Sequence, residues 1–224
     1  MEIKGKIFAF LGDSITEGVG VDDIENCRYD NVLRREYGLA ATHNYGIGGT
    51  RIAHQSAPSE KPRHDLCFCG RVYNIDPNAD IIVVYGGAND YIHGDAYIGT
   101  PEDKTPATFC GGVNFLMDYL MENFADKTVV FMTPARMHFK GVPDTVPSAR
   151  PMKKPDAMPL VGYVDIIKAA AEKRGIPVLD MYRDFPINPN IPEHREKYTS
   201  DGLHFNDAGH VIIAKTLGEF LLSL

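Results

Sequence analysis

The run Ile81-Ile82-Val83-Val84-Tyr85 restricts the fold of this 224-residue chain more than any other stretch. It follows Asp80, contains no polar residue before its tyrosine, and stops at Gly86-Gly87. Such a short apolar run, rich in β-branched residues and bounded by glycines, is typical of a β-strand. Because both faces of the strand would be apolar, it belongs inside a parallel sheet covered by helices on both sides. The run therefore predicts an α/β protein.

Further strand-like runs alternate with helical patterns along the chain. The predicted strands cover residues 7–11, 42–45, 80–85, 128–132 and 176–181. Apolar residues at helical spacing predict helices over 29–37, 113–124, 160–171 and 206–224, the last capped by Asn206. This alternation predicts a three-layer α/β/α sandwich with right-handed crossovers. We expect one domain over residues 1–224, with a flavodoxin-like, five-stranded parallel sheet in the order 2-1-3-4-5.

Two segments lack a regular pattern. Residues 51–78 are rich in Pro, Arg and His, and we expect mostly loop there with room for a short helix. Residues 135–159 contain five prolines and predict a long excursion from the carboxyl edge of the sheet.

Charge and composition exclude several classes of function. Thirty acidic and 23 basic residues give a net charge of −7, which argues against nucleic acid as a partner and against binding to an anionic membrane. The first residues do not resemble a secretion signal, and no apolar run approaches the ~18 residues of a membrane span. We therefore expect a soluble, cytoplasmic protein without membrane insertion. The sequence makes no prediction about its oligomeric state.

The cysteines indicate neither disulfide bonds nor a metal centre. A chain of this length can form a hydrophobic core that does not require disulfide bonds. His64, Cys67 and Cys69 lie close together in the sequence, but no second ligand pair with zinc-like spacing follows them. We expect neither a metal nor another cofactor.

Ser14 is the candidate nucleophile. It follows Gly12-Asp13 directly after the first predicted strand. In an open α/β sheet, catalytic groups collect at the carboxyl ends of the strands, where the loops converge.

A nucleophilic serine requires a base held in the correct tautomer by an acceptor. Among the eight histidines, His204 is the best placed, because Asp201 precedes it by three residues in a tight turn before the last helix. The alternative is that Asp201 only starts a turn and His204 is a surface residue. Asp180, at the end of the fifth predicted strand, is a rival orienting group.

Donors for an oxyanion are expected from two other strand ends. Gly49 offers an N–H without a side chain in the way, and Asn89 offers a side-chain amide. Gly46 and Gly48 compete with Gly49 for this role. A purely structural role is the alternative for each of these residues, because glycines are common in turns after strands and Asn89 can cap a helix.

Four sequence blocks together resemble the SGNH (GDSL-like) hydrolase family from near the N-terminus to the last helix. They are Gly12-Asp13-Ser14 with the following Ile15-Thr16-Glu17-Gly18, the glycine block 44–50, Gly87-Ala88-Asn89-Asp90, and Asp201-Gly202-Leu203-His204. The resemblance implies that Ser14 attacks an ester carbonyl, that His204 transfers the proton, and that Asp201 orients His204. It also implies an oxyanion hole formed by the amides of Ser14 and Gly49 and the side chain of Asn89.

The function expected from these blocks is hydrolysis of short-chain carboxylic esters, with a small-molecule ester as the binding partner. Asp13, Tyr91, His93 and Arg136 are candidate substrate contacts. Basic residues outnumber acidic ones in the 135–159 excursion, which indicates either a polar or anionic substrate, such as an acylated sugar, or merely a solvated loop. The alternative function is a flavodoxin-like electron carrier that binds the phosphate of FMN at Ser14-Ile15-Thr16. The Asp13 carboxylate would repel that phosphate.

Overall fold

The computed structural model describes residues 1–148 and 150–224. Its main sheet contains five parallel strands in the order β2-β1-β3-β4-β7. Their bounds are β1 Ile7–Gly12, β2 Ala41–Gly46, β3 Ile81–Tyr85, β4 Thr128–Met132 and β7 Val178–Leu179. This arrangement confirms the predicted parallel α/β/α sandwich and its 2-1-3-4-5 order.

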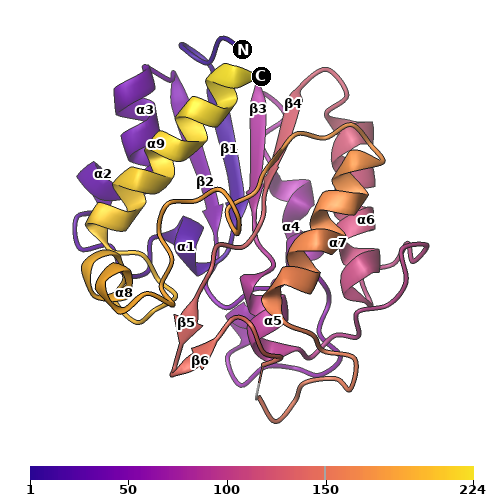
Figure 1. Cartoon of the computed structure of the whole chain (residues 1–224). Helices are drawn as coiled ribbons and strands as arrows, with labels where there is room; N and C mark the ends of the chain where they lie inside the picture. Colours follow the sequence, from indigo (N-terminus) through magenta and orange to yellow (C-terminus); the bar gives the residue numbers. More distant parts are fainter. Residues whose placement is uncertain (149) are drawn as a thin grey trace.

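Helices cover both faces of the sheet (Figure 1). On one side lie α2 (Ile24–Cys27), α3 (Tyr29–Tyr37) and α9 (Asp207–Ser223). On the other side lie α4 (Phe68–Arg71), α6 (Phe109–Asn123) and α7 (Leu160–Glu172). The remaining helices are α1 (Ser14–Glu17), α5 (Ala88–His93), α8 (Pro192–Tyr198) and the 3₁₀ turns Pro62–Asp65 and Val72–Asn74.

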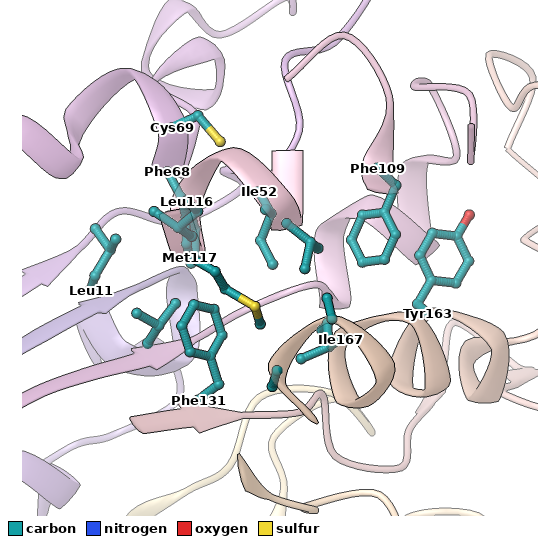
Figure 2. Packing of buried hydrophobic residues seen from close by; sticks show 14 of the residues in the cluster. Leu11, Ile52, Phe68, Cys69, Phe109, Leu116, Met117, Phe131, Tyr163 and Ile167 are labelled. Atoms are coloured by element: carbon teal, nitrogen blue, oxygen red, sulfur yellow. The ribbon is translucent and has the colours of Figure 1, made fainter. Parts of the chain in front are cut away.

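Alternate side chains of the central strands enter two separate cores. On β1, Phe8 and Phe10 pack with α3 and α9, whereas Ala9 and Leu11 pack with the helices of the opposite face. Figure 2 shows part of this second core, in which Leu11 and Phe131 of the sheet lie near Met117 of α6. Every residue of β3 is buried, which is why its sequence is apolar on both faces.

The fifth predicted strand is much shorter than expected. Only Val178 and Leu179 pair with β4, whereas the prediction covered 176–181. The Ile176 N–H instead donates a hydrogen bond to Ala171 O in the turn after α7. The Met181 N–H donates a hydrogen bond to Leu179 O. Local turn bonds at both ends therefore limit the strand.

The 135–159 excursion contains a two-stranded hairpin, although its five prolines predicted no regular element there. Strand β5 (His138–Phe139) pairs antiparallel with β6 (Val142–Pro143). The hairpin lies at the carboxyl end of the sheet, at the opposite end of the molecule from both termini (Figure 1). Within the described parts of the chain, no helix is both long and apolar enough to cross a lipid bilayer.

Candidate active site

Ser14 is the first residue of α1 and lies directly beyond the end of β1. The Asp13 carboxylate caps this helix by accepting a hydrogen bond of 3.0 Å from the Ile15 N–H. Burial raises the pKa of Asp13 to about 6, although the Ile15 amide, His204 and Arg71 oppose this effect. Ser14 itself keeps 7% of its surface exposed.

A turn before α9 brings His204 to Ser14. The Nε2 atom of His204 lies 2.9 Å from Ser14 Oγ, and its Nδ1 atom lies 2.7 Å from Asp201 Oδ2. Because a carboxylate only accepts hydrogen bonds, Nδ1 carries the proton and Nε2 is left to accept one from the serine. The arrangement matches the requirements of a nucleophile, a base and an orienting acid.

The Asp201 carboxylate also organises its own turn. Its Oδ1 atom accepts hydrogen bonds from the N–H groups of Leu203 and His204, at 3.0 and 2.8 Å. Burial alone would raise the pKa of Asp201, but the hydrogen bonds from His204 and Leu203 lower it below its ordinary value. The carboxylate is therefore ionised and fixed. The rival Asp180 is instead bound to Lys168 and Arg183.

The β5–β6 hairpin supports this turn from outside. The His138 N–H donates to Gly202 O at 2.9 Å, and the Phe139 ring lies edge-on to His204 with centroids 6.3 Å apart. Sequence reasoning missed both contacts, because the prolines around the hairpin hid its two short strands.

The three candidate glycines differ in what their amides do. The Gly46 N–H donates to Asn44 Oδ1 at 2.9 Å, and the Gly48 N–H donates to Glu17 Oε2 at 2.7 Å. Among residues 1–148 and 150–224, the Gly49 N–H has no acceptor. Of the three, Gly49 is thus the glycine whose amide is available to a ligand.

Asn89 stands at the start of α5, and 6% of its surface is exposed. One hydrogen of its Nδ2 group donates to Thr50 O at 3.1 Å, next to Gly49. This bond orients the amide and leaves its second hydrogen available. The neighbouring Asp90 accepts hydrogen bonds from the N–H groups of Ile52 and Ala53, and burial raises the pKa of Asp90 to about 7.

Arg71 joins the loops that form the site. Its guanidinium donates to Gly12 O at 2.7 Å and to Thr50 Oγ1 at 3.0 Å, and it also binds the carbonyls of Tyr45 and Leu66. Burial lowers the pKa of Arg71 to about 10, so that it stays charged at neutral pH. It therefore fixes the ends of β1 and β2 against the glycine loop. No sequence pattern predicts this role, since Arg71 lies in the stretch without periodicity.

The four candidate substrate contacts have different surroundings. Asp13 is 2% exposed and serves as the cap of α1. Tyr91 is buried, and its hydroxyl donates to Val146 O at 2.9 Å beside the hairpin. The Arg136 guanidinium lies over the Tyr182 ring at 4.4 Å. Only His93 lines a large cleft.

That cleft has a volume of about 700 Å³ and lies between the 57–64 loop on one side and Lys140 with residues 150–152 on the other. His64 lines it and also covers Gly49, so that the cleft begins at the glycine loop. Cys67 and Cys69, considered with His64 as metal ligands, are buried in the core. In the described residues, no group of three or more His, Cys, Asp or Glu side chains is arranged to hold a metal ion.

The chain belongs to the GDSL-like Lipase/Acylhydrolase family, whose model matches residues 10–212. Membership in this family implies hydrolysis of esters. A comparison with curated proteins found no match.

Solved structures share the fold over nearly the whole chain. A protein from Lactobacillus plantarum is 29% identical, with a TM-score of 0.80 and coverage of 98% of each chain. A protein from Chitinophaga pinensis, described as a possible lipase, is 18% identical, with a TM-score of 0.67 over 97% of this chain and 98% of its own. A variant of an acetyl-xylooligosaccharide esterase from Geobacillus is 20% identical, with a TM-score of 0.62 over 99% of this chain and 96% of its own.

Proposed function

We propose that this protein is a serine esterase that hydrolyses short-chain carboxylic esters. The observation that carries the proposal is the unbroken series of hydrogen bonds from Ser14 Oγ through His204 to Asp201, at 2.9 and 2.7 Å. A serine hydroxyl is a weak nucleophile, and a correctly oriented imidazole is what activates it.

In the proposed mechanism, Ser14 Oγ attacks the ester carbonyl while its proton moves to His204 Nε2. The negative charge on the carbonyl oxygen is stabilised by the N–H groups of Ser14 and Gly49 and by the Asn89 amide. The tetrahedral intermediate collapses as His204 returns the proton to the leaving alcohol. Water, deprotonated by the same imidazole, then hydrolyses the acyl-serine and releases the acid.

A small apolar recess supports a preference for short acyl chains. Its volume is about 160 Å³, and its walls include Tyr91, Ile92, Phe139 and Val142. Since Phe139 contacts His204, the recess lies beside the proposed catalytic group. Its size suits an acetyl or similarly short chain rather than a long fatty acid. The fold shared with an acetyl-xylooligosaccharide esterase makes an acetylated carbohydrate a reasonable substrate class.

A flavodoxin-like FMN carrier is the alternative. In that function the turn at Ser14 would bind a phosphate, but the Asp13 carboxylate lies in the same turn and Ser14 Oγ already faces His204. Purified protein with bound flavin, visible as a yellow colour, would favour this alternative over the esterase.

Hydrolysis of 4-nitrophenyl acetate tests the esterase proposal directly. We expect the wild-type protein to release 4-nitrophenol and Ser14→Ala to reduce kcat by at least about 10³-fold. Equal rates for both proteins, with unchanged circular dichroism, would contradict the proposal.

A further inference from the structure

We infer that the cleft beside Gly49 binds an anionic group on the alcohol part of the ester, so that the substrate is a short-chain acyl ester of an acidic or phosphorylated alcohol. This inference rests on the proposed esterase function and specifies the substrate class of the same site.

Two residues that line the cleft connect it to the proposed catalytic centre from two sides. On one side, His64 lines the cleft and packs against Gly49. On the other side, Lys140 lines the cleft and places its Nζ over the Phe139 ring at 5.4 Å, while Phe139 contacts His204. A leaving group that extends from an ester at Ser14 past His64 or Phe139 would therefore enter the cleft.

The charged groups lining the cleft are predominantly cationic. Lys61, Lys140 and Arg150 line it, and in the described parts of the chain none of the three forms an ion pair. The carboxylate of Asp95 is bound to Arg51, which leaves Glu60 as the one lining carboxylate without a cation. The cations thus outnumber the acid that could neutralise them.

This concentration of positive charge contrasts with the rest of the molecule. The chain as a whole carries a net charge of −7, so cations gathered in one cleft create a local potential opposite to that of the whole protein. Two imidazoles in the cleft have lowered pKa values, mainly because they are buried. Burial and then Arg51 lower the pKa of His93 to about 4, with a further contribution from Arg150. Burial, Arg51 and Lys61 likewise lower the pKa of His64.

The sizes of the recess and of the cleft indicate that the anionic group belongs to the alcohol part of the ester. The apolar recess of about 160 Å³ suits the acyl chain, whereas the cleft of about 700 Å³ remains for the larger leaving group. Lys140 and Arg150 line both spaces and stand at their junction. Carboxylate and phosphate are both suitable anions, because lysine binds either as a point charge and arginine can bind either through two N–H groups.

The test compares three acetate esters: 4-acetoxybenzoate, 4-acetoxyphenyl phosphate and the neutral methyl 4-acetoxybenzoate. The ratio of kcat/KM for an anionic ester to that for the neutral ester is measured for wild type and for Lys140→Glu/Arg150→Glu. Comparing this ratio between variants cancels the intrinsic reactivity of each ester. We expect the double variant to lower it by about tenfold for at least one anion, and that anion identifies the preferred group.

The matched control is Lys4→Glu/Arg34→Glu, which changes the net charge by the same amount. Lys4 precedes β1 and is therefore at the end of the sheet opposite to the cleft. Arg34 lies on α3, a helix that does not line the cleft. This control should keep the wild-type ratio. In wild type, raising NaCl from ~20 to ~500 mM should also reduce the preference for the anion, because screening weakens exposed charge pairs. A ratio that is the same in both double variants, or insensitive to salt, would overturn the inference.

A binding measurement separates this inference from the proposed function. Calorimetry on Ser14→Ala uses the same anionic esters as ligands that are not turned over, with and without the Lys140→Glu/Arg150→Glu changes. Binding that depends on the two cations, without any ester hydrolysis by wild type, would overturn the esterase function and leave the anion site standing. Hydrolysis of the neutral ester without such binding would overturn the anion site alone.

Discussion

The imidazole of His64 lies over Gly49, so closely that a Cβ atom at position 49 would stand 2.5 Å from His64 Cδ2. Gly49 also has a φ of +78°, in the left-handed region that favours glycine. Two independent constraints therefore require glycine at this position, and both concern the backbone whose N–H is proposed to stabilise the oxyanion.

Gly49→Ala should reduce kcat toward 4-nitrophenyl acetate by about 10²-fold or more, because the displaced amide can no longer reach the oxyanion. Gly175→Ala is the matched control, since Gly175 has a φ of +66° but no atom within 4 Å of an added Cβ. It should lower the melting temperature through backbone strain and leave kcat near wild type. Equal kcat values for the two variants would exclude Gly49 as a donor.

Asp201→Asn should lower kcat by about 10⁴-fold, because an amide facing His204 Nδ1 favours the wrong imidazole tautomer. The measurement is steady-state hydrolysis, with circular dichroism to verify the fold. Asp180→Asn provides the comparison, because Asp180 binds Lys168 and Arg183. If Asp180→Asn impaired kcat more than Asp201→Asn did, the orienting acid would have to be reassigned.

Arg71→Lys tests a positioning role. A single ammonium cannot reach Gly12 O, Tyr45 O, Leu66 O and Thr50 Oγ1 together, so we expect the glycine loop to shift relative to Ser14. A displacement of this kind should lower kcat by about 10- to 100-fold, with a much smaller change in KM.

The same substitution at Arg174 is the control for that variant. Arg174 binds Asp118 at 2.6 Å and Ala170 O at 2.9 Å, within the α6–α7 layer. Arg174→Lys should alter stability only. A fall in kcat of similar size in both variants would mean that Arg71 acts through general stability alone.

His210 makes stability depend on pH. Its Nδ1 atom accepts the Tyr29 N–H at 3.3 Å, and burial lowers the pKa of His210 to about 3. Because the unfolded chain binds a proton below about pH 6.5 and the folded chain does not, stability is lost as the pH falls from about 6.5 toward 3.

Urea unfolding of wild type and His210→Asn at pH 5 and 7.5 measures this contribution. The free energy of unfolding of wild type relative to the variant should be about 2 kcal/mol lower at pH 5 than at pH 7.5. The raised pKa values of Asp13 and Asp90 act in the opposite direction, with stability falling as the pH rises, but they are common to both proteins and cancel in the difference. A difference that does not vary with pH would show that His210 has the same pKa in the folded and unfolded chains, and would contradict this prediction.

The sheet could be predicted because the apolar runs of β1 and β3 are buried and end at glycines, and because β4 continues the same apolar pattern. The positions of Ser14, Asn89 and His204 followed from strand ends and tight turns, which are local in the sequence. Arg71 could not be predicted, because its partners are backbone carbonyls that only the folded sheet brings together.

The hairpin was missed for a related reason. Strands of two residues have no detectable alternation, and the contact of His138 with Gly202 joins distant parts of the chain. The same segment also determines the surroundings of Tyr91, which the sequence offered only as a candidate substrate contact. Its hydroxyl donates a hydrogen bond to Val146 O, and its ring is buried.

Labelling with a fluorophosphonate probe, followed by mass mapping of the modified peptide, tests the central claim most directly. Such probes react with serines that are activated as nucleophiles, and His204 Nε2 lies 2.9 Å from the Ser14 hydroxyl. We predict a single label on Ser14 in wild type and loss of that label in His204→Ala. A label on any other residue, or equal labelling of Ser14 with and without His204, would contradict the account.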